Sequence, residues 1–309
     1  MRPIRELAVV SGKGGTGKTS LVASFAALAE NKVLADCDVD AADLHLVLSP
    51  EVIERGDFVG GKSAKVIVEN CVGCGKCAEV CRFDAVSFNG PANDVVAKTY
   101  RIDGLSCEGC GVCAHVCPAG AVDFSPCVSG EYFISETRHG ILVHARLGIA
   151  RENSGKLVTL VRREARRIAD ERKLDLVIID GAPGIGCPVI ASLAGADTAL
   201  IVTEATISGL HDLDRVADLA AHFGIPACVC INKCDINPEM TRKIERHSKR
   251  RGLDVLGVIR YDPEVTKAQI AGMSAVEMNG GPAARDIRSI WAGLQTLLNA
   301  PRAKGRQHS

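Results

Sequence analysis

The stretch "ELAVVSGKGGTGKTSLVASFAALA", residues 6–29, decides the fold. Residues 7–10 form a short apolar run typical of a buried strand, and apolar residues recur at helical spacing from Lys18 onward. Between these segments, Gly12 to Thr19 fits the pattern G-x-x-x-x-G-K-[ST]. A glycine loop that joins a strand to a helix points its backbone N–H groups at phosphates. The stretch therefore predicts a nucleotide site at the end of the first strand.

Two side chains of this loop have defined tasks. Lys18 is expected to reach the β- and γ-phosphates, and the hydroxyl of Thr19 is expected to bind Mg²⁺ at the start of the helix. Backbone groups of the loop supply the remaining contacts with the phosphates. The predicted loop residues are Gly12, Lys13, Gly14, Gly15, Thr16, Gly17, Lys18, Thr19 and Ser20.

The rest of the chain alternates apolar strands with helical segments. Strands are expected in "KVLADCDVDAADL" (32–44), "LDLVIIDGAPGIGC" (174–187) and "CVCINKCD" (228–235), and one helix is expected to be capped by Ser208 and to stop at Gly224. The segment "EYFISETRHGILVHARL" (131–147) predicts a hairpin turning near Gly140 and extending the sheet edge. Together these segments predict an α/β fold with a doubly wound, mostly parallel sheet.

Eight of the fourteen cysteines fall in two runs, "CVGCGKCAEVC" (71–81) and "CEGCGVCAHVCP" (107–118). Thiolates at i, i+3 and i+6 on a glycine loop can bind three irons of one cubane, and in two-cluster ferredoxins the fourth cysteine binds the other cluster. We expect this fourth cysteine to begin a helix. Two zinc sites are the alternative, but zinc prefers paired C-x₂-C knuckles. The predicted ligand sets are Cys71, Cys74, Cys77 and Cys117 for one [4Fe–4S] cluster, and Cys107, Cys110, Cys113 and Cys81 for the second.

The two runs are halves of an internal repeat with a period of 36 residues, since "RFDAVSF" (82–88) matches "PAGAVDF" (118–124). The segment closely resembles a bacterial two-cluster ferredoxin. One departure is Arg82, which follows the first run where a proline follows the second. We expect a small α+β ferredoxin-like domain at residues 62–126, inserted between two parts of a nucleotide-binding domain at 1–61 and 127–309.

With Lys13 the loop reads K-G-G-x-G-K-T, and outside the cysteine segment the chain resembles the MinD/ParA/nitrogenase-iron-protein group of P-loop ATPases. The resemblance implies ATP hydrolysis by an ATP-dependent homodimer in which Lys13 reaches the phosphates of the facing subunit. It also implies that Asp38 orients the attacking water, that Asp180 holds Mg²⁺ through water, and that Asn232 meets the adenine edge. Asp235 resembles the guanine-reading N-K-x-D motif, so GTP stays an alternative to ATP.

Composition limits the other functions of the chain. Lysine plus arginine equal aspartate plus glutamate at 37 each, so no overall field favours nucleic acid or an anionic membrane. The N-terminus has no apolar stretch long enough for a signal peptide or membrane span, which together with metal-type cysteine spacing predicts a cytoplasmic protein with reduced thiols. The apolar stripe of the last helix is expected to pack on the sheet rather than on a membrane; it comprises Ile287, Ile290, Trp291, Leu294, Leu297 and Leu298.

Two functions from different classes fit these features. The first is a nucleotide-gated ATPase that transfers electrons or handles iron–sulfur or metallocofactors, with a redox or cluster-binding protein as its partner. The second is a spatial organiser of the MinD/ParA type, in which the clusters serve as a redox sensor or structural staple. The placement of the cysteine segment between the two predicted switch aspartates, Asp38 and Asp180, favours the first.

Overall fold

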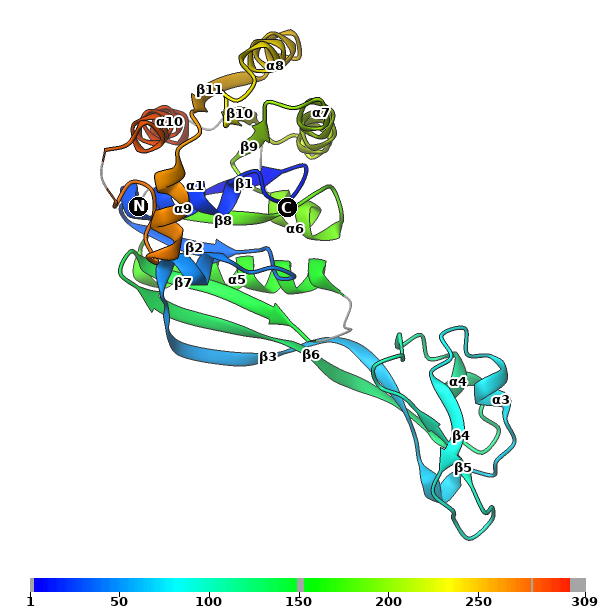
Figure 1. Cartoon of the computed structure of the whole chain (residues 1–309). Helices are drawn as coiled ribbons and strands as arrows, with labels where there is room; N and C mark the ends of the chain where they lie inside the picture. Colours follow the sequence, from blue (N-terminus) through cyan, green and yellow to red (C-terminus); the bar gives the residue numbers. More distant parts are fainter. Residues whose placement is uncertain (1–2, 149–152, 279, 301–309) are drawn as a thin grey trace. The chain divides into compact units, whose positions relative to one another are not determined.

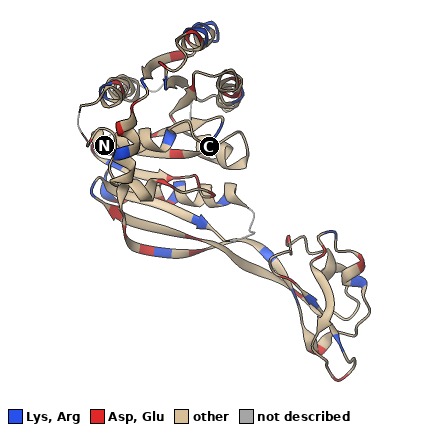
Figure 2. Ribbon diagram, in the orientation of Figure 1, with Lys and Arg blue, Asp and Glu red and all other residues tan. Residues whose placement is uncertain are grey.

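The computed structural model of the chain describes residues 3–148, 153–278 and 280–300 (Figure 1). The chain divides into two compact units. The sheet unit comprises Met1–Arg55, Phe133–Ala145 and Val158–Ser309, and the cysteine unit comprises Gly56–Tyr132 and Arg146–Leu157. Positive and negative side chains are interspersed along both units (Figure 2), as expected for a chain without net charge.

The centre of the sheet unit is β1 (Arg5–Ser11), which pairs in parallel with β8 (Leu176–Pro183) and β9 (Thr198–Glu204). The full strand order is β11-β10-β9-β1-β8-β2-β7-β6-β3. Residues 7–10 of β1 are fully buried, because helices cover both faces of the sheet and leave no polar side. The predicted doubly wound, mostly parallel α/β sheet is confirmed. The other parallel strands are β2 (Lys32–Asp36), β7 (Gly140–Leu147), β10 (Ala227–Asn232) and β11 (Asp254–Ile259).

Helices α1 (Lys18–Leu28) and α10 (Pro282–Asn299) cover one face of the sheet, and α6 (Cys187–Leu193) and α7 (Ile207–His222) cover the other (Figure 1). Phe25 of α1 packs against Trp291 of α10 with ring centroids 5.0 Å apart. The expected apolar stripe of the last helix is confirmed as a core face, with Leu297 alone partly exposed. The remaining helices of the unit are α2 (Leu44–Leu48), α5 (Ser154–Arg172), α8 (Pro238–Arg250) and α9 (Pro263–Ile270).

Two long strands carry the chain from one unit to the other. β3 (Glu51–Val66) begins in the sheet unit and ends in the cysteine unit, and β6 (Val122–Thr137) returns. The boundaries expected at residues 62 and 126 fall inside these strands. The hairpin predicted near Gly140 is formed by β6 and β7, and it extends the sheet beyond β2 as expected. β3 is not predicted by the sequence pattern.

The cysteine unit is a small α+β element. Its antiparallel pair consists of β4 (Val86–Gly90) and β5 (Thr99–Ile102), and its short helices are α3 (Lys76–Glu79) and α4 (Val112–Val116), preceded by a 3₁₀ turn, η1 (Val68–Asn70). The expectation that the fourth cysteine of each run begins a helix is wrong. α3 and α4 start at left-handed glycines inside the runs and end before Cys81 and Cys117.

The cap of α7 also differs from the prediction. Thr206, not Ser208, is the N-cap residue, and its hydroxyl accepts the N–H of Gly209 at 2.9 Å. Both residues are hydroxyl side chains at the start of the same helix, so the sequence pattern alone did not separate them. Gly224 follows the end of this helix with a left-handed φ of 64°, as expected. No helix in the described residues is both long and apolar enough to cross a membrane.

A half-buried carboxylate holds the β6–β7 turn in place. Glu277 accepts hydrogen bonds from Arg138 Nε at 2.7 Å, and from the N–H and hydroxyl of Ser274 at 2.7 and 2.6 Å. The His139 ring lies 2.8 Å away, and Arg138 also donates to the carbonyls of Val47 and Gly272. Burial acts to raise the pKa of Glu277, but these hydrogen bonds outweigh burial and hold the pKa well below its ordinary value.

We expect Glu277→Gln to lower the free energy of unfolding of the sheet unit by about 2 kcal/mol at pH 7, because several charge-assisted hydrogen bonds are lost. A carboxylate with a depressed folded-state pKa contributes fully above its unfolded pKa of about 4.3 and loses this contribution as the pH falls below it. The difference between variant and parent should therefore shrink below pH 4. Urea unfolding at pH 7 and below pH 4, followed by the fluorescence of Trp291, the only tryptophan of the sequence, measures the loss and its decrease.

The matched control is Glu136→Gln, an exposed carboxylate of the same hairpin. It should change the stability by less than about 0.5 kcal/mol. Equal effects of the two substitutions would show that Glu277 does not organise the turn.

Candidate functional site

The glycine loop connects β1 to α1 as predicted. Gly15 and Gly17 have left-handed φ angles of 77° and 87°. A Cβ on Gly17 would lie 2.3 Å from Asn232 Nδ2, and one on Gly12 would lie 2.4 Å from Asp212 Cβ. Side chains at these two positions would push the loop away from its neighbours, so packing requires glycine at both, and the left-handed φ of Gly17 requires it for conformation too.

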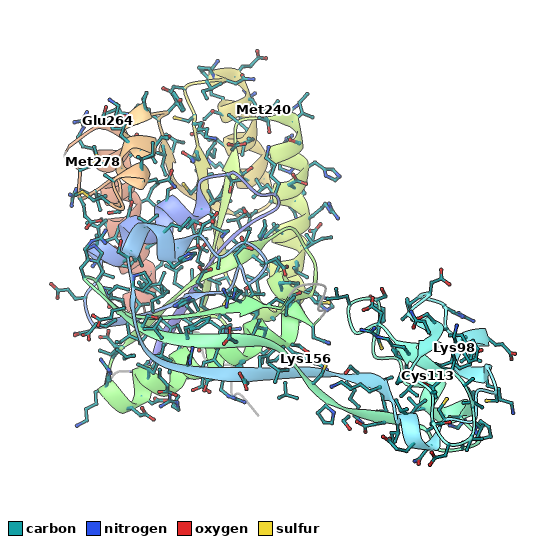
Figure 3. The ribbon with its side chains drawn as sticks, turned by 60° about the horizontal axis from the view of Figure 1, so that its bottom comes forward. Lys98, Cys113, Lys156, Met240, Glu264 and Met278 are labelled. Atoms are coloured by element: carbon teal, nitrogen blue, oxygen red, sulfur yellow. The ribbon has the colours of Figure 1, made fainter. Side chains whose placement is uncertain are left out.

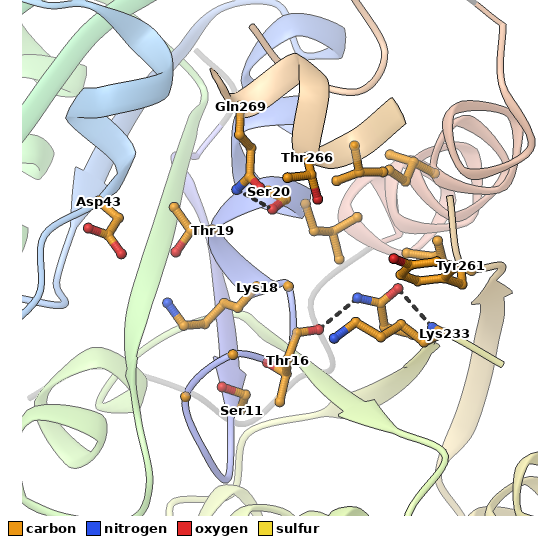
Figure 4. Close-up of a pocket in the computed structure, with 18 of the residues that line it drawn as sticks. Ser11, Thr16, Lys18, Thr19, Ser20, Asp43, Lys233, Tyr261, Thr266 and Gln269 are labelled. Atoms are coloured by element: carbon orange, nitrogen blue, oxygen red, sulfur yellow. Dashed lines mark hydrogen bonds between the residues drawn. The ribbon is translucent and has the colours of Figure 1, made fainter. Parts of the chain in front are cut away.

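A cavity of about 450 Å³ lies against this loop (Figure 4). It includes most of the predicted nucleotide-binding residues, namely Gly14, Gly15, Thr16, Gly17, Lys18, Thr19, Ser20, Asp38 and Asn232. Gly12, Lys13 and Asp180 do not line it. The volume and the glycine loop together suit a nucleotide with its phosphates against the start of α1.

One buried ammonium group faces three carboxylates at the carboxyl ends of β2 and β8. Lys18 Nζ donates to Asp180 Oδ1 at 2.6 Å and lies 3.9 Å from Asp38. Asp36 is fully buried behind them, and its oxygens accept the N–H groups of Asp38 and Leu44. Burial acts to lower the pKa of Lys18, but the carboxylates outweigh burial and leave the pKa above its ordinary value. Burial, together with Asp180, raises the pKa of Asp36 well above its ordinary value.

Two buried oxygens of this site lack a hydrogen-bond partner among the described residues. They are Asp180 Oδ2 and Thr16 Oγ1. Buried polar atoms are normally paired, so such atoms beside a cavity suit a site that water, a ligand or a cation completes. The unpaired oxygen of Asp180 and the Thr19 hydroxyl at the cavity are both oxygen donors, the type of ligand that the predicted Mg²⁺ requires.

Lys13 is held away from the cavity by a residue that the sequence analysis missed. Its Nζ lies 3.1 Å from Glu204 Oε2 and 3.4 Å from Ser208 Oγ. Glu204 also binds Lys233 at 2.6 Å, so one carboxylate holds two lysines. Burial acts to raise the pKa of Glu204, but the two lysines outweigh it and lower the pKa. A signal was available, because Glu204 ends an apolar strand at the same sheet edge as Asp180.

Asn232 and Asp235 are both engaged by the protein itself. Asn232 Nδ2 donates to the carbonyl of Thr16 at 2.7 Å, and its Oδ1 accepts the N–H of Lys233 at 2.9 Å (Figure 4). Asp235 Oδ1 accepts the N–H of Tyr261 at 2.7 Å and does not line the cavity. The carboxylate that a guanine-reading motif requires therefore holds a neighbouring loop and does not line the cavity.

The far wall of the cavity was also missed from the sequence. It is formed by the loop after β11 and by α9, including Arg260, Tyr261, Asp262, Val265, Thr266 and Gln269. Gln269 Nε2 donates to Ser20 Oγ at 2.8 Å and so joins this wall to the phosphate loop. The segment has no motif, and only the pairing of β11 with β10 brings it to the site.

The predicted cysteine ligands fall around two cavities of the cysteine unit, which contains the labelled Cys113 in Figure 3. Cys71, Cys74, Cys77 and Cys117 line the first cavity. Cys81, Cys107, Cys110 and Cys113 line the second. Each run thus lends its fourth cysteine to the cavity of the other run. No three His, Cys, Asp or Glu side chains among the described residues converge closely enough to hold one metal ion.

Comparison with known proteins identifies the family. Residues 7–276 match the model of the CobQ/CobB/MinD/ParA nucleotide binding domain, and the chain therefore belongs to this family of MinD/ParA-type P-loop ATPases. An uncharacterized protein of Methanocaldococcus jannaschii, MJ0578, is 34% identical over 76% of this chain and 80% of its own length.

Two further proteins are more distantly similar to this chain. The iron-sulfur cluster carrier protein of Pyrococcus furiosus is 25% identical over 44% of this chain and 50% of its own length. The structure of the septum site-determining protein MinD from Pyrococcus horikoshii, complexed with Mg-ADP, covers 97% of this chain and 99% of that chain with a TM-score of 0.58 and 16% identity. This last likeness establishes the fold.

We expect Asp38→Asn to raise the free energy of unfolding by about 2 kcal/mol at pH 8. Burial raises the pKa of Asp38 to about 6, so the folded state binds its proton more tightly than the unfolded state does. Ionised Asp38 therefore destabilises the fold, and the cost grows as the pH rises from about 4 through 6. Urea unfolding of the nucleotide-free protein, followed by Trp291 fluorescence at pH 8 and pH 4, measures the gain and its disappearance.

Asp40→Asn serves as the matched control, because Asp40 is exposed in the same loop. Its stability should change little at either pH. A loss of stability in Asp38→Asn at pH 8 would contradict the claim that ionised Asp38 destabilises the fold.

Proposed function

We propose that this protein binds and hydrolyses ATP, holds two [4Fe–4S] clusters in its cysteine unit, and uses its nucleotide state to gate electron transfer or the handling of iron–sulfur or metallocofactors. The observation that carries the proposal is the sorting of eight thiols into two cavities of four, in a chain that also has a P-loop site. The ferredoxin-like part is the expected domain at residues 62–126, which lies inside the cysteine unit.

The cysteine sets fit the proposed clusters by donor type and number. Thiolate is the ligand of [4Fe–4S] clusters, and each cavity has four thiols. The four cysteine thiolates that hold a cubane each bind a different iron, so this arrangement does not require three thiolates to converge on one ion. When bound, each cluster supplies a one-electron acceptor. The similarity to an iron-sulfur cluster carrier over part of the chain supports the same chemistry.

The nucleotide site supports ATP hydrolysis through named side chains. Lys18 binds the β- and γ-phosphates, Thr19 and Asp180 hold Mg²⁺, Asp38 orients the attacking water, and Asn232 lies at the adenine edge. Lys13 reaches the phosphates of a second copy in an ATP-dependent homodimer. Glu204 and Ser208 hold Lys13 within its own subunit, so dimer formation exchanges these contacts for phosphate oxygens.

The chain path links the nucleotide site to the cysteine unit. α2 follows the loop that bears Asp38, and its first N–H is bound by Asp36 Oδ2 at 3.3 Å. β3 begins three residues after the end of α2, and Arg138 of the returning hairpin donates to the carbonyl of Val47 in α2 at 3.1 Å. A change at Asp36 or Asp38 on nucleotide binding therefore acts on the elements to which both connecting strands are attached.

A MinD/ParA-like spatial switch is the second candidate. The overall likeness to MinD structures favours it, and the clusters would then act as a redox sensor without electron transfer. The two candidates share the ATPase cycle and differ in whether nucleotide and cluster redox state are energetically coupled.

Anaerobically purified protein should contain about eight irons and eight sulfides per chain and show [4Fe–4S] EPR signals on reduction. Cys117→Ser should remove the cluster of the first set and Cys81→Ser that of the second, each with loss of about half of the iron. Iron and acid-labile sulfide analysis measures both. Stoichiometric zinc without sulfide would refute the cluster assignment.

Cys127→Ser is the matched control, since Cys127 lies in β6 of the same unit and lines neither cavity. It should keep the full iron content. Iron loss in this variant equal to that in Cys117→Ser would show general unfolding in place of ligand loss.

Binding of Mg-ATP should shift the midpoint potential of the clusters, and reduction should change ATP affinity by the same factor, because coupling between two sites is reciprocal. Coupling energies of about 1–3 kcal/mol are typical. Redox titrations with and without Mg-ATP, and ATP binding to oxidised and reduced protein, measure the two sides of the cycle. Asp38→Ala is used to retain ATP during the titration.

Lys13→Ala tests the role of the dimer in this coupling. It should bind ATP, fold normally, and lose ATP-induced dimers, ATP hydrolysis and the potential shift. Lys243→Ala, an exposed lysine of α8, is the control and should retain all three. If Mg-ATP does not change the midpoint potentials of the clusters, and reduction does not change the affinity for ATP, the result would favour the spatial switch.

A further inference from the structure

The two cysteine cavities have almost the same walls. Eleven of the residues that line the first cavity have a counterpart, 36 positions away, in the lining of the second. The counterparts include the eight cysteines and apolar pairs such as Val66 with Ile102 and Val86 with Val122. The internal repeat of the sequence is therefore also a repeat of the two sites. Differences between corresponding wall residues are differences in the surroundings of the two clusters.

Charge distinguishes the two walls at two of these positions. Lys76 lines the first cavity, and its counterpart in the second is Val112. Glu108 lines the second cavity, and its counterpart in the first is Val72. Lys76 and Glu108 are the only charged residues in the two linings. Both differences act in the same sense, because the first site gains a cation and the second gains an anion.

We propose that Lys76 and Glu108 set the two clusters at different potentials, so that the cluster of Cys71, Cys74, Cys77 and Cys117 accepts electrons from the cluster of Cys81, Cys107, Cys110 and Cys113. This inference rests on the clusters of the proposed function. Reduction of a cluster adds one negative charge. A nearby cation stabilises the reduced form and raises the potential, and a nearby anion lowers it.

Other charges of the cysteine unit act on the sites less directly. Lys62 Nζ lies over the Phe124 ring, 5.2 Å from its centroid, and a Cβ on Gly111 of the second run would lie 2.7 Å from this ring. Lys62 therefore opposes Glu108, but neither Lys62 nor Phe124 lines the second cavity. Glu79 and His115 are a further unlike pair of the repeat, and they line neither cavity. Lys76 and Glu108 are both exposed, so salt should weaken their influence.

EPR-monitored redox titration of the anaerobically purified full chain at low salt tests the proposal. We expect two midpoint potentials whose separation corresponds to about a tenfold one-electron equilibrium constant, which is about 59 mV. Lys76→Val should lower only the higher potential, and Glu108→Val should raise only the lower one. The double variant should bring the two potentials together, because each substitution installs the residue of the other half of the repeat.

Further measurements separate the proposal from its alternatives. About 1 M salt should narrow the gap in the parent protein. Lys62→Met should lower the lower potential by less than Glu108→Val raises it. A larger effect of Lys62→Met, or two potentials that do not move in the single variants, would overturn the assignment to Lys76 and Glu108. A parent protein that contains no iron and shows no [4Fe–4S] EPR signals would instead refute the clusters themselves.

Discussion

The buried contact between Lys18 and Asp180 is the interaction on which the nucleotide site depends. Parallel strands β2 and β8 bring their carboxyl ends to one place, so Asp36, Asp38 and Asp180 surround a single ammonium group. Three carboxylates around one lysine are not neutralised, and the raised pKa values of Asp36 and Asp38 express the cost of keeping them ionised. In the proposed function, phosphates that attract Lys18 would leave Asp180 free to bind a cation.

The same group of carboxylates connects nucleotide binding to the rest of the fold. Asp36 binds the first N–H of α2, and the end of α2 is held by Arg138, which Glu277 fixes in turn. These contacts join β2, α2 and the β6–β7 turn by hydrogen bonds to charged groups, which are stronger than neutral ones. β3, which enters the cysteine unit, begins just after α2, and β6, which returns from it, ends at the β6–β7 turn. Within the sheet unit, hydrogen bonds thus connect the carboxylates of the nucleotide site to the segments that lead into β3 and out of β6.

The sequence predicted those features that depend on local pattern. Residues 7–10, the glycine loop, the helix from Lys18 and the hairpin at Gly140 follow from periodicity and turn chemistry, and all are present. Glu204 and the wall at Arg260 to Gln269 were missed because parallel pairing of distant strands brings them to the site. β3 was missed because nine of its sixteen residues are exposed, so burial imposes no clear alternation on it. The Thr206 cap required the observed hydrogen bond to Gly209.

The repeat within the cysteine unit has a physical consequence beyond its symmetry. Two sites with identical walls would hold an electron equally well, and the equilibrium constant between them would be one. A preferred direction of electron transfer requires a difference between the walls that acts on the negative charge gained during reduction. Apolar differences, such as Phe83 in place of Ala119, change the potential mainly through solvent exposure. In the proposed clusters, Lys76 and Glu108 would act on that charge directly. Because the two residues lie in different halves of the repeat and have opposite signs, their effects on the potential difference add.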